Sequence, residues 1–144
     1  MQPAYHLNVE SETRGSDINT ITIGLLAFNR EHTDGAAPQY VVITVRDDAE
    51  QIAGGLVGLF YLGWLHIHAL WLKEDLRGQG YGHSLLTRAE EEAMQRGCEN
   101  ACLETYSFQA LSFYEKHGYV AFAELEGLPP GGKKHFLRKP LKSS

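Results

Sequence analysis

The chain has 144 residues, of which 43% are hydrophobic and 22% charged, and its formal net charge is −5. This length and composition suit one globular domain with its own core and exclude a disordered or fibrous protein. The negative charge excludes the basic surface that neutralises nucleic-acid phosphates, so we expect no nucleic-acid partner.

The first half of the chain predicts one helix and three strands. After a short extended segment near residues 5–12, Asp17 is placed to cap a helix over residues 17–31, where apolar residues recur at helical spacing. Apolar runs then predict an antiparallel meander of three strands, at residues 40–45, 52–62 and 65–72. Several glycines in the second of these strands indicate a bulge or close packing.

A glycine-rich stretch opens the next predicted helix. We expect this helix to run to about Arg96 and to end at Gly97, because glycine is favoured just past a helix C-terminus. Its apolar stripe consists of Gly82, Leu85, Leu86, Ala89 and Ala93.

The last third of the chain predicts a strand, a helix and two further strands. A strand at residues 101–106 precedes a helix over residues 107–117, with Ser107 placed to cap it. Strands near residues 119–125 and 134–139 complete a mixed α/β fold without an internal repeat or a linker.

The glycines at Gly78, Gly80 and Gly82 suit an anion. A helix N-terminus with nearby glycines presents free backbone N–H groups and a partial positive charge, which together form a phosphate cradle. The stretch lacks the GxxxxGK pattern of a Walker loop, and His83 stands where a dinucleotide fingerprint has its third glycine. Both nucleotide interpretations are therefore disfavoured.

Two stretches of the sequence resemble the GCN5-related N-acetyltransferase (GNAT) superfamily. Arg77-x-x-Gly80-x-Gly82 is similar to its pyrophosphate-binding motif, [QR]-x-x-G-x-[GA]. Residues 107–119 are similar to its downstream pattern N-x-x-A-x-x-x-Y-E-K-x-G-F/Y, except that Ser107 replaces the asparagine. The order and spacing of the two motifs support the resemblance, which covers residues 40–125 well and residues 1–35 only by the order of elements.

The resemblance implies a single N-acetyltransferase domain over residues 1–144, with a central twisted mixed sheet flanked by helices. It also implies acetyl-CoA as the acetyl donor, with no metal. In that family the pantetheine arm lies like an extra strand where two sheet strands splay apart, here beside Leu70, Trp71 and Leu72. Ser107 can still donate one hydrogen bond to the cofactor, but its side chain is shorter than that of the family's asparagine. The residues implied to enclose the pyrophosphate, mainly through backbone N–H groups, are Arg77, Gly78, Gln79, Gly80, Tyr81, Gly82, His83 and Ser84.

Tyr114 is the residue that the resemblance assigns to protonating the departing CoA thiolate. A phenol with a pKa of about 10 lies near enough to an alkyl thiol for this transfer. The alternative for Tyr114 is a core tyrosine on an apolar helix face.

His66 and His68 lie two residues apart in a predicted strand, so both side chains emerge on one face just before the glycine-rich stretch. An imidazole can accept the proton of an ammonium and free the amine for attack. The stretch from His66 to Leu70 also resembles the His-x-His strand of arylalkylamine N-acetyltransferases, in which the pair is the base. The alternatives are two structural histidines, or Glu104 on the adjacent strand as the base.

The remaining candidate residues have simpler interpretations. Trp64, Tyr61 and Trp71 line an acceptor pocket or belong to the core. The two cysteines, Cys98 and Cys102, match neither a disulfide framework nor a zinc pattern, so we expect both to be small core residues.

The predicted function is transfer of an acetyl group from acetyl-CoA to a primary amine of a small molecule or peptide, by direct attack. The alternatives are a non-catalytic acyl-CoA sensor and a structural domain without a ligand. The N-terminus lacks the features of a signal peptide and no apolar run is long enough to span a bilayer. We therefore expect a cytoplasmic enzyme with no membrane partner, and a homodimer remains open.

Overall fold

The computed structural model of the chain describes residues 4–142. It divides into two compact units, Met1–Ala37 and Pro38–Ser144. That residues 1–144 form one domain stays a prediction.

The first unit contains one helix, α1 (Gly15–Glu31). The extended segment expected near residues 5–12 forms neither a helix nor a strand. The prediction that Asp17 caps α1 is wrong, because the helix begins earlier: Arg14 is the N-cap, and its carbonyl accepts the N–H of Asp17 at 3.2 Å. Asp17 instead lies in the first turn, where a carboxylate interacts favourably with the helix dipole.

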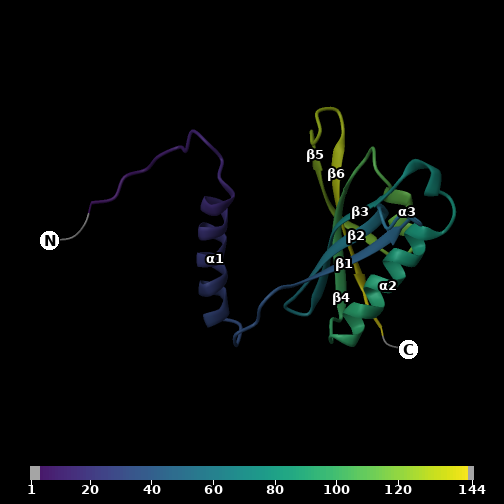
Figure 1. Cartoon of the computed structure of the whole chain (residues 1–144), viewed down its shortest axis with the longest axis horizontal. Helices are drawn as coiled ribbons and strands as arrows, with labels where there is room; N and C mark the ends of the chain where they lie inside the picture. The colour runs from purple at the N-terminus through teal and green to yellow at the C-terminus, as the bar shows by residue number, and fades with distance from the viewer. Residues whose placement is uncertain (1–3, 143–144) are drawn as a thin grey trace. The chain divides into compact units, whose positions relative to one another are not determined.

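The second unit is built on a six-stranded mixed sheet with the strand order β1-β2-β3-β4-β6-β5 (Figure 1). The first three strands form the predicted antiparallel meander, and β4 then joins β3 in parallel. Every predicted strand is present with ends within one residue of those expected. The strands are β1 (Gln39–Arg46), β2 (Ile52–Tyr61), β3 (Trp64–Leu72), β4 (Asn100–Tyr106), β5 (Val120–Glu126) and β6 (Lys133–Pro140).

The parallel junction between β3 and β4 is short. It holds four residue pairs, from Trp64 with Asn100 to Ile67 with Leu103. Beyond the last pair both strands continue, β3 to Leu72 and β4 to residue 106, without pairing to each other. The sheet therefore opens between its two halves at the carboxyl ends of these strands.

A bulge on β3 lies at the point where the strands part. Ile67 pairs with Gly58 on β2 and Ala69 pairs with Val57, which leaves His68 as the extra residue. The glycines of β2 were expected to mark a bulge or close packing, and the structure confirms both. A Cβ on Gly58 would lie 3.2 Å from the His66 carbonyl oxygen, so no larger residue fits there without a shift.

Two helices and a short turn cover one face of the sheet. After the 3₁₀ turn η1 (Glu74–Leu76), which the sequence analysis missed, α2 (Tyr81–Gln95) packs against β2 and β3. Figure 1 shows α3 (Leu111–Lys116) on the same face as α2. The predicted stripe of α2 is buried in full, and its core partners include Leu56, Leu65, Ile67, Leu103 and Leu137.

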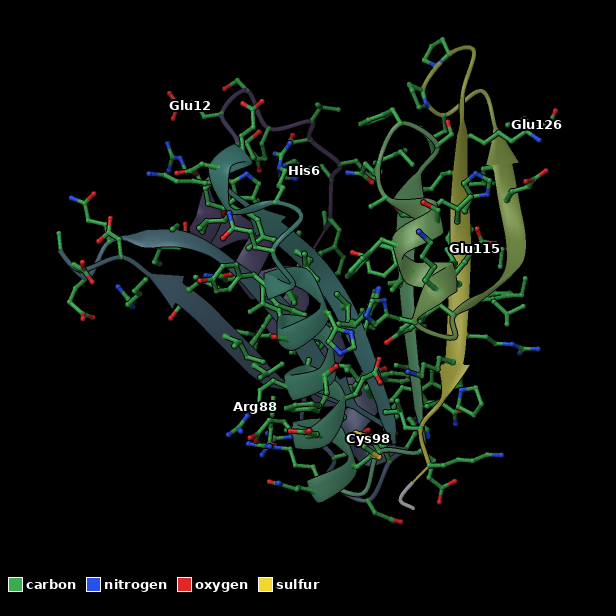
Figure 2. The ribbon with its side chains drawn as sticks, turned by 90° about the vertical axis from the view of Figure 1, so that its right-hand side faces the viewer. His6, Glu12, Arg88, Cys98, Glu115 and Glu126 are labelled. Carbon is green, nitrogen blue, oxygen red and sulfur yellow. The ribbon has the colours of Figure 1, made fainter. Side chains whose placement is uncertain are left out.

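Figure 2 contrasts an exposed side chain of α2 with a buried one just after the helix. Arg88 points away from the sheet, whereas Cys98 lies beyond the end of the helix and is buried at 7% exposure, as expected for a core cysteine. Among the residues that the structure describes, no helix combines the length and apolarity needed to cross a membrane.

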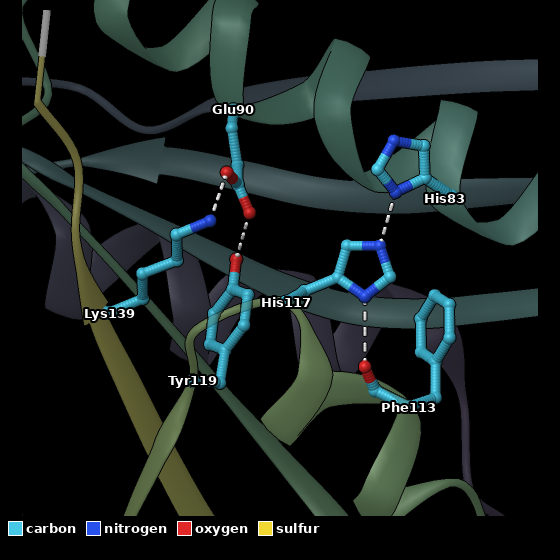
Figure 3. Close-up of polar contacts among 6 residues, drawn as sticks. All are labelled: His83, Glu90, Phe113, His117, Tyr119 and Lys139. Atoms are coloured by element: carbon cyan, nitrogen blue, oxygen red, sulfur yellow. Dashed lines mark hydrogen bonds and ion pairs between the residues drawn. The ribbon is translucent and has the colours of Figure 1, made fainter.

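Glu90 is a buried acid that the apolar stripe of α2 did not predict. One of its carboxylate oxygens accepts the Tyr119 hydroxyl at 2.9 Å, and the other accepts Lys139 Nζ at 2.7 Å (Figure 3). The burial of Tyr119 and the nearby carboxylate raise the pKa of its phenol, so it stays protonated as a donor. This three-residue network connects α2 to β6 and to the chain that follows α3.

Candidate functional site

A pocket of about 760 Å³ lies at the opening between β3 and β4. Both strands contribute the segments that no longer pair with each other, and the first turn of α2 and the segment around α3 close the remaining sides. Its walls are Ile67–Leu72, Arg77, Gly78, Gly80, Gly82, His83, Leu103–Thr105, Phe108–Ala110, Phe113 and Tyr114.

Part of the glycine-rich loop lines this pocket. Gly78 and Gly80 have φ values of +76° and +90°, and a Cβ at either position would meet nothing within 4 Å. Gly80 is the N-cap of α2 and offers no side-chain cap, so the N–H groups of the first turn are free to bind an anion. The loop therefore fits a pyrophosphate.

Gly82 brings α2 close to α3. A Cβ on this residue would lie 3.2 Å from the ring of Phe113, a contact tighter than most side chains allow. The absence of a side chain at Gly82 thus maintains the width of the pocket between the two helices.

Three other predicted loop residues use their side chains within the loop itself. Arg77 lines the pocket while its Nε donates to the Leu72 carbonyl at 3.2 Å. The Gln79 side-chain nitrogen donates to the Asp75 carbonyl at 2.6 Å, and the Ser84 hydroxyl donates to the Gly80 carbonyl at 3.1 Å. Gln79, Tyr81 and Ser84 are not among the residues that line the pocket.

The three residues expected to bind pantetheine line the pocket. Leu70, Trp71 and Leu72 occupy the part of β3 that lies beyond its last pair with β4. The backbone edge that faces β4 is therefore free of ladder bonds, as an extra strand requires.

Tyr114 belongs both to the core and to the pocket. Its ring stands edge-on to those of Phe113 and Tyr119, with centroids 5.1 and 6.0 Å away, and 9% of the residue remains exposed. Burial raises the pKa of the Tyr114 phenol, so the hydroxyl is protonated at neutral pH. The core and acid interpretations are thus compatible with the same position.

His66, His68 and Glu104 form one cluster on the sheet face opposite α2. The His66 ring nitrogen Nε2 lies 2.9 Å from Glu104 Oε2, and the His66 and His68 ring centroids are 4.5 Å apart. Lys134 Nζ lies 3.4 Å from the other Glu104 oxygen. The two candidate bases of the sequence analysis are therefore connected by a hydrogen bond, and His68 and Glu104 line the pocket whereas His66 does not.

The surroundings favour different charge states for Glu104 and His68. Burial alone would raise the pKa of the Glu104 carboxyl, but hydrogen bonds from His66 and Lys134 outweigh it and lower the pKa. Partial burial and the neighbouring His66 lower the pKa of the His68 imidazole, and Glu104 only partly offsets this. At neutral pH, Glu104 is ionised and His68 is neutral, with a free lone pair for a proton.

The predicted role of Ser107 as a helix cap is wrong. Its hydroxyl accepts the Lys133 N–H at 3.1 Å, and its own N–H donates to the Lys133 carbonyl at 2.8 Å. These bonds hold Ser107 in a turn, and α3 begins only at Leu111. Ser107 does not line the pocket, so its predicted cofactor contact has no support from this position.

Phe108 and Gln109 line the pocket although the sequence analysis assigned them no role. Gln109 accepts the Tyr106 N–H at 2.8 Å through Oε1, which shapes the turn beneath it. The signal in the sequence for this wall was the family pattern over residues 107–119, which covers the segment but gives Phe108 and Gln109 no role.

The expectation for the aromatic residues is met only in part. Trp71 lines the pocket, whereas Tyr61 and Trp64 pair with each other at the opposite end of the β2–β3 hairpin. Cys102 is only partly buried, beside His66, and lies outside the core cluster, so the prediction that it is a core residue is wrong. Burial together with Glu104 raises the pKa of its thiol. Within residues 4–142, no group of three or more His, Cys, Asp or Glu side chains is arranged to hold a metal ion.

Residues 5–119 match the model of the acetyltransferase (GNAT) family. The chain is 42% identical over 119 residues to the blasticidin-S acetyltransferase of Streptomyces morookaense, which covers 81% of this chain and 88% of that protein. It is 37% identical over 115 residues to an acetyltransferase of Agrobacterium fabrum, which covers 80% and 84% of the two chains. The crystal structure of an acetyltransferase from Bacillus cereus matches with a TM-score of 0.79 and 33% identity, over 94% of this chain and 98% of that chain.

Proposed function

Because the chain belongs to the GNAT family of acetyltransferases, we propose that it transfers the acetyl group of acetyl-CoA to a small-molecule amine that approaches His68. The family and the relatives establish an acetyltransferase that uses acetyl-CoA. They lend no support to a non-catalytic acyl-CoA sensor. The acceptor and the catalytic residues are the subject of the proposal.

The pocket supports this proposal because it connects the two faces of the sheet. Tyr114 reaches it from the helix-covered face, and His68 and Glu104 reach it from the opposite face. This is the observation that carries the proposal, since an acetyl transfer needs a proton acceptor at the amine and a proton donor at the sulfur. The proton donor, Tyr114, and the proton acceptor, His68, then reach one opening from different sides of the sheet.

The residues that line the pocket fit acetyl-CoA, the acetyl donor. Backbone N–H groups of the α2 first turn and the open space at Gly78 and Gly80 suit the pyrophosphate. The unpaired edge of β3 at Leu70 to Leu72 suits the amide groups of pantetheine. Acetyl-CoA held there would supply an activated thioester carbonyl for the reaction.

In the proposed reaction, His68 accepts a proton from the ammonium, and the resulting amine attacks the acetyl carbonyl directly. Backbone N–H groups of β3 near the bulge donate to the carbonyl oxygen, where negative charge develops. The Tyr114 hydroxyl donates its proton to the sulfur as the C–S bond breaks, and the second proton that the nitrogen loses on becoming an amide restores the Tyr114 hydroxyl. Glu104 holds His66 beside His68 and stabilises the imidazolium that forms there.

Transfer through an acetylated cysteine is disfavoured. The pKa of the Cys102 thiol is raised by burial and then by Glu104, so the thiolate that would be the nucleophile is scarce at neutral pH. Cys102 also does not line the pocket. Direct attack by the amine needs no such intermediate.

The acceptor is proposed to be a small molecule with a cationic amine. The ionised Glu104 in the pocket and the exposed aromatic Phe108 at its edge suit a cation that carries a flat group. The 42% identity with a blasticidin-S acetyltransferase makes blasticidin S the first compound to test.

The test measures CoA thiol release and the acetylated product with a panel of amines: blasticidin S, polyamines, amino acids, aminoglycosides and peptide N-termini. We expect one small-molecule amine to be acetylated far faster than the rest. Binding of acetyl-CoA without acetylation of any amine in the panel would contradict the proposed acceptor class. Preferential acetylation of a peptide N-terminus would also contradict it.

The base is tested with the amine that the panel identifies. Because the pKa of His68 lies below its usual value, kcat/KM should stay constant as the pH falls and decline only below about 6.5, where the protonated imidazole can no longer accept a proton. His68→Gln should lower kcat/KM about 100-fold and remove this acidic limb. His135→Gln, on β6 beside Glu124, is the matched control and should change neither. A larger loss in Glu104→Gln, with the acidic limb intact in His68→Gln, would assign the base to Glu104.

A further inference from the structure

Two histidines from different helices meet beside the proposed pyrophosphate loop. Nδ1 of His83, in the first turn of α2, lies 2.5 Å from Nε2 of His117, the C-cap of α3. Nδ1 of His117 lies 2.9 Å from the Phe113 carbonyl oxygen (Figure 3). The His83 ring lines the pocket, and the His117 ring also packs on Phe113 with centroids 4.5 Å apart.

The carbonyl at one end of this chain determines where the protons lie. A carbonyl oxygen only accepts, so His117 Nδ1 must carry the proton that it donates to Phe113. In a neutral His117 the other nitrogen, Nε2, then has a lone pair and accepts the N–H of His83 Nδ1. The one nitrogen lone pair that the two rings leave without a hydrogen bond between them is on His83 Nε2.

One added proton can therefore be accommodated without breaking either contact, and it goes to His83 Nε2. The resulting imidazolium donates through both nitrogens, one to His117 and one to a ligand in the pocket. The proton between His83 Nδ1 and His117 Nε2 can lie on either nitrogen, and in both arrangements His83 Nε2 carries an N–H. In either arrangement, the added proton is presented to the pocket by His83, which lines it.

Resting on the proposed function, we propose that His83, held by His117, is a proton-linked phosphate-binding residue. In this proposal the pair takes up one proton at His83 Nε2 when the pyrophosphate of CoA binds. A pyrophosphate anion at the N-terminus of α2 accepts a charge-assisted hydrogen bond from an imidazolium, which favours uptake of the proton when the anion binds. Histidine is the side chain suited to this, because it gains and loses its proton between about pH 5 and 8.

None of the charged or titratable groups named below pairs with the His83 imidazolium or takes up the proton in its place. The first turn of α2 carries no acidic residue that would pair with the imidazolium in place of the ligand. Arg77 in the same pocket is a permanent cation, and the raised pKa of Tyr114 keeps that neighbour neutral. Lys139, near the chain after α3, is paired with Glu90. On α3 itself, Glu115 and Lys116 carry opposite charges next to His117.

The test is calorimetric titration with CoA at pH 7 in two buffers of different ionisation enthalpy, repeated from pH 6 to 8. We expect the wild-type protein to take up about half a proton at pH 7 and His83→Gln to take up none beyond that of CoA itself. Between pH 6 and 8 the wild type should lose up to about tenfold more affinity than His83→Gln, equivalent to 1.4 kcal/mol. His135→Gln is the control and should behave as the wild type.

Variants of His117 test its positioning role. His117→Ala removes the acceptor and should reduce proton uptake, whereas the amide oxygen of His117→Gln can accept from His83 and should restore part of it. Melting temperatures confirm that each variant is folded. Tight CoA binding with equal proton uptake in the wild type and His83→Gln would overturn this inference and leave the proposed function intact. If CoA does not bind the folded wild-type protein at all, the proposed function fails with it.

Discussion

Tyr114 shows how one residue can serve two purposes at the boundary between core and pocket. Its ring packs against Phe113 and Tyr119, and the residue lines the opening where the thioester is proposed to lie. A tyrosine is suited to such a boundary because its ring is apolar and its hydroxyl is polar.

We expect Tyr114→Phe to retain the affinity for acetyl-CoA and to lower kcat by about 100-fold to 10,000-fold, because the ring still packs and only the proton donor is lost. Steady-state kinetics with the identified amine and calorimetry with acetyl-CoA measure the two quantities. Tyr119→Phe is the matched control: it removes the hydrogen bond to Glu90, outside the pocket, and should lower stability while kcat stays near wild type. The opposite pattern would make Tyr114 a core residue alone.

The sequence located the candidate chemistry at the level of single residues but not its connections. His66, His68 and Glu104 were each recognised, yet the hydrogen bond between His66 and Glu104 joins positions 38 residues apart. Which strands pair, and in which register, decides such a contact, and no local pattern encodes the parallel junction of β3 with β4. Motif spacing could predict the glycine-rich loop because its chemistry is contained within a few consecutive residues.

Helix boundaries were the least predictable feature at the level of elements. Ser107 has the side chain of a helix cap, but the backbone of Lys133, 26 residues further on, occupies its hydroxyl. Asp17 likewise lies within a helix that it was expected to begin. Capping preferences act locally, and a tertiary or backbone contact at the same residue overrides them.

The approach of α2 to α3 at Gly82 has a direct test. Gly82→Val should weaken CoA binding at least tenfold, about 1.4 kcal/mol, because the new side chain meets the Phe113 ring and displaces the loop or narrows the pocket. Calorimetric titration with CoA measures this. Gly24→Val is the control, since that helical glycine has nothing within 4 Å of its Cβ position. Unchanged affinity in a folded Gly82→Val protein would remove the loop from the binding site.

For the molecule as a whole, the Glu90 network joins segments that are far apart in the sequence. Lys139→Met should destabilise the protein by about 3 kcal/mol, because it leaves a buried carboxylate without its cation. Denaturant unfolding measures the change. Arg96→Met, which breaks the exposed pair with Glu92, should cost no more than about 1 kcal/mol. Equal effects of the two changes would show that Glu90 does not depend on Lys139.

Formation of a homodimer stays a prediction.

Because the junction between β3 and β4 is short, bound acetyl-CoA would become a structural part of the sheet. Only the four pairs from Trp64 with Asn100 to Ile67 with Leu103 join its two three-stranded halves. The amide hydrogens of Leu70 to Leu72 that face the opening should therefore exchange rapidly with deuterium in the free protein. Bound CoA should slow this exchange and also that of the β4 amides near Thr105, across the opening. Substrate loading would then make the two halves of the sheet unfold as a single cooperative unit.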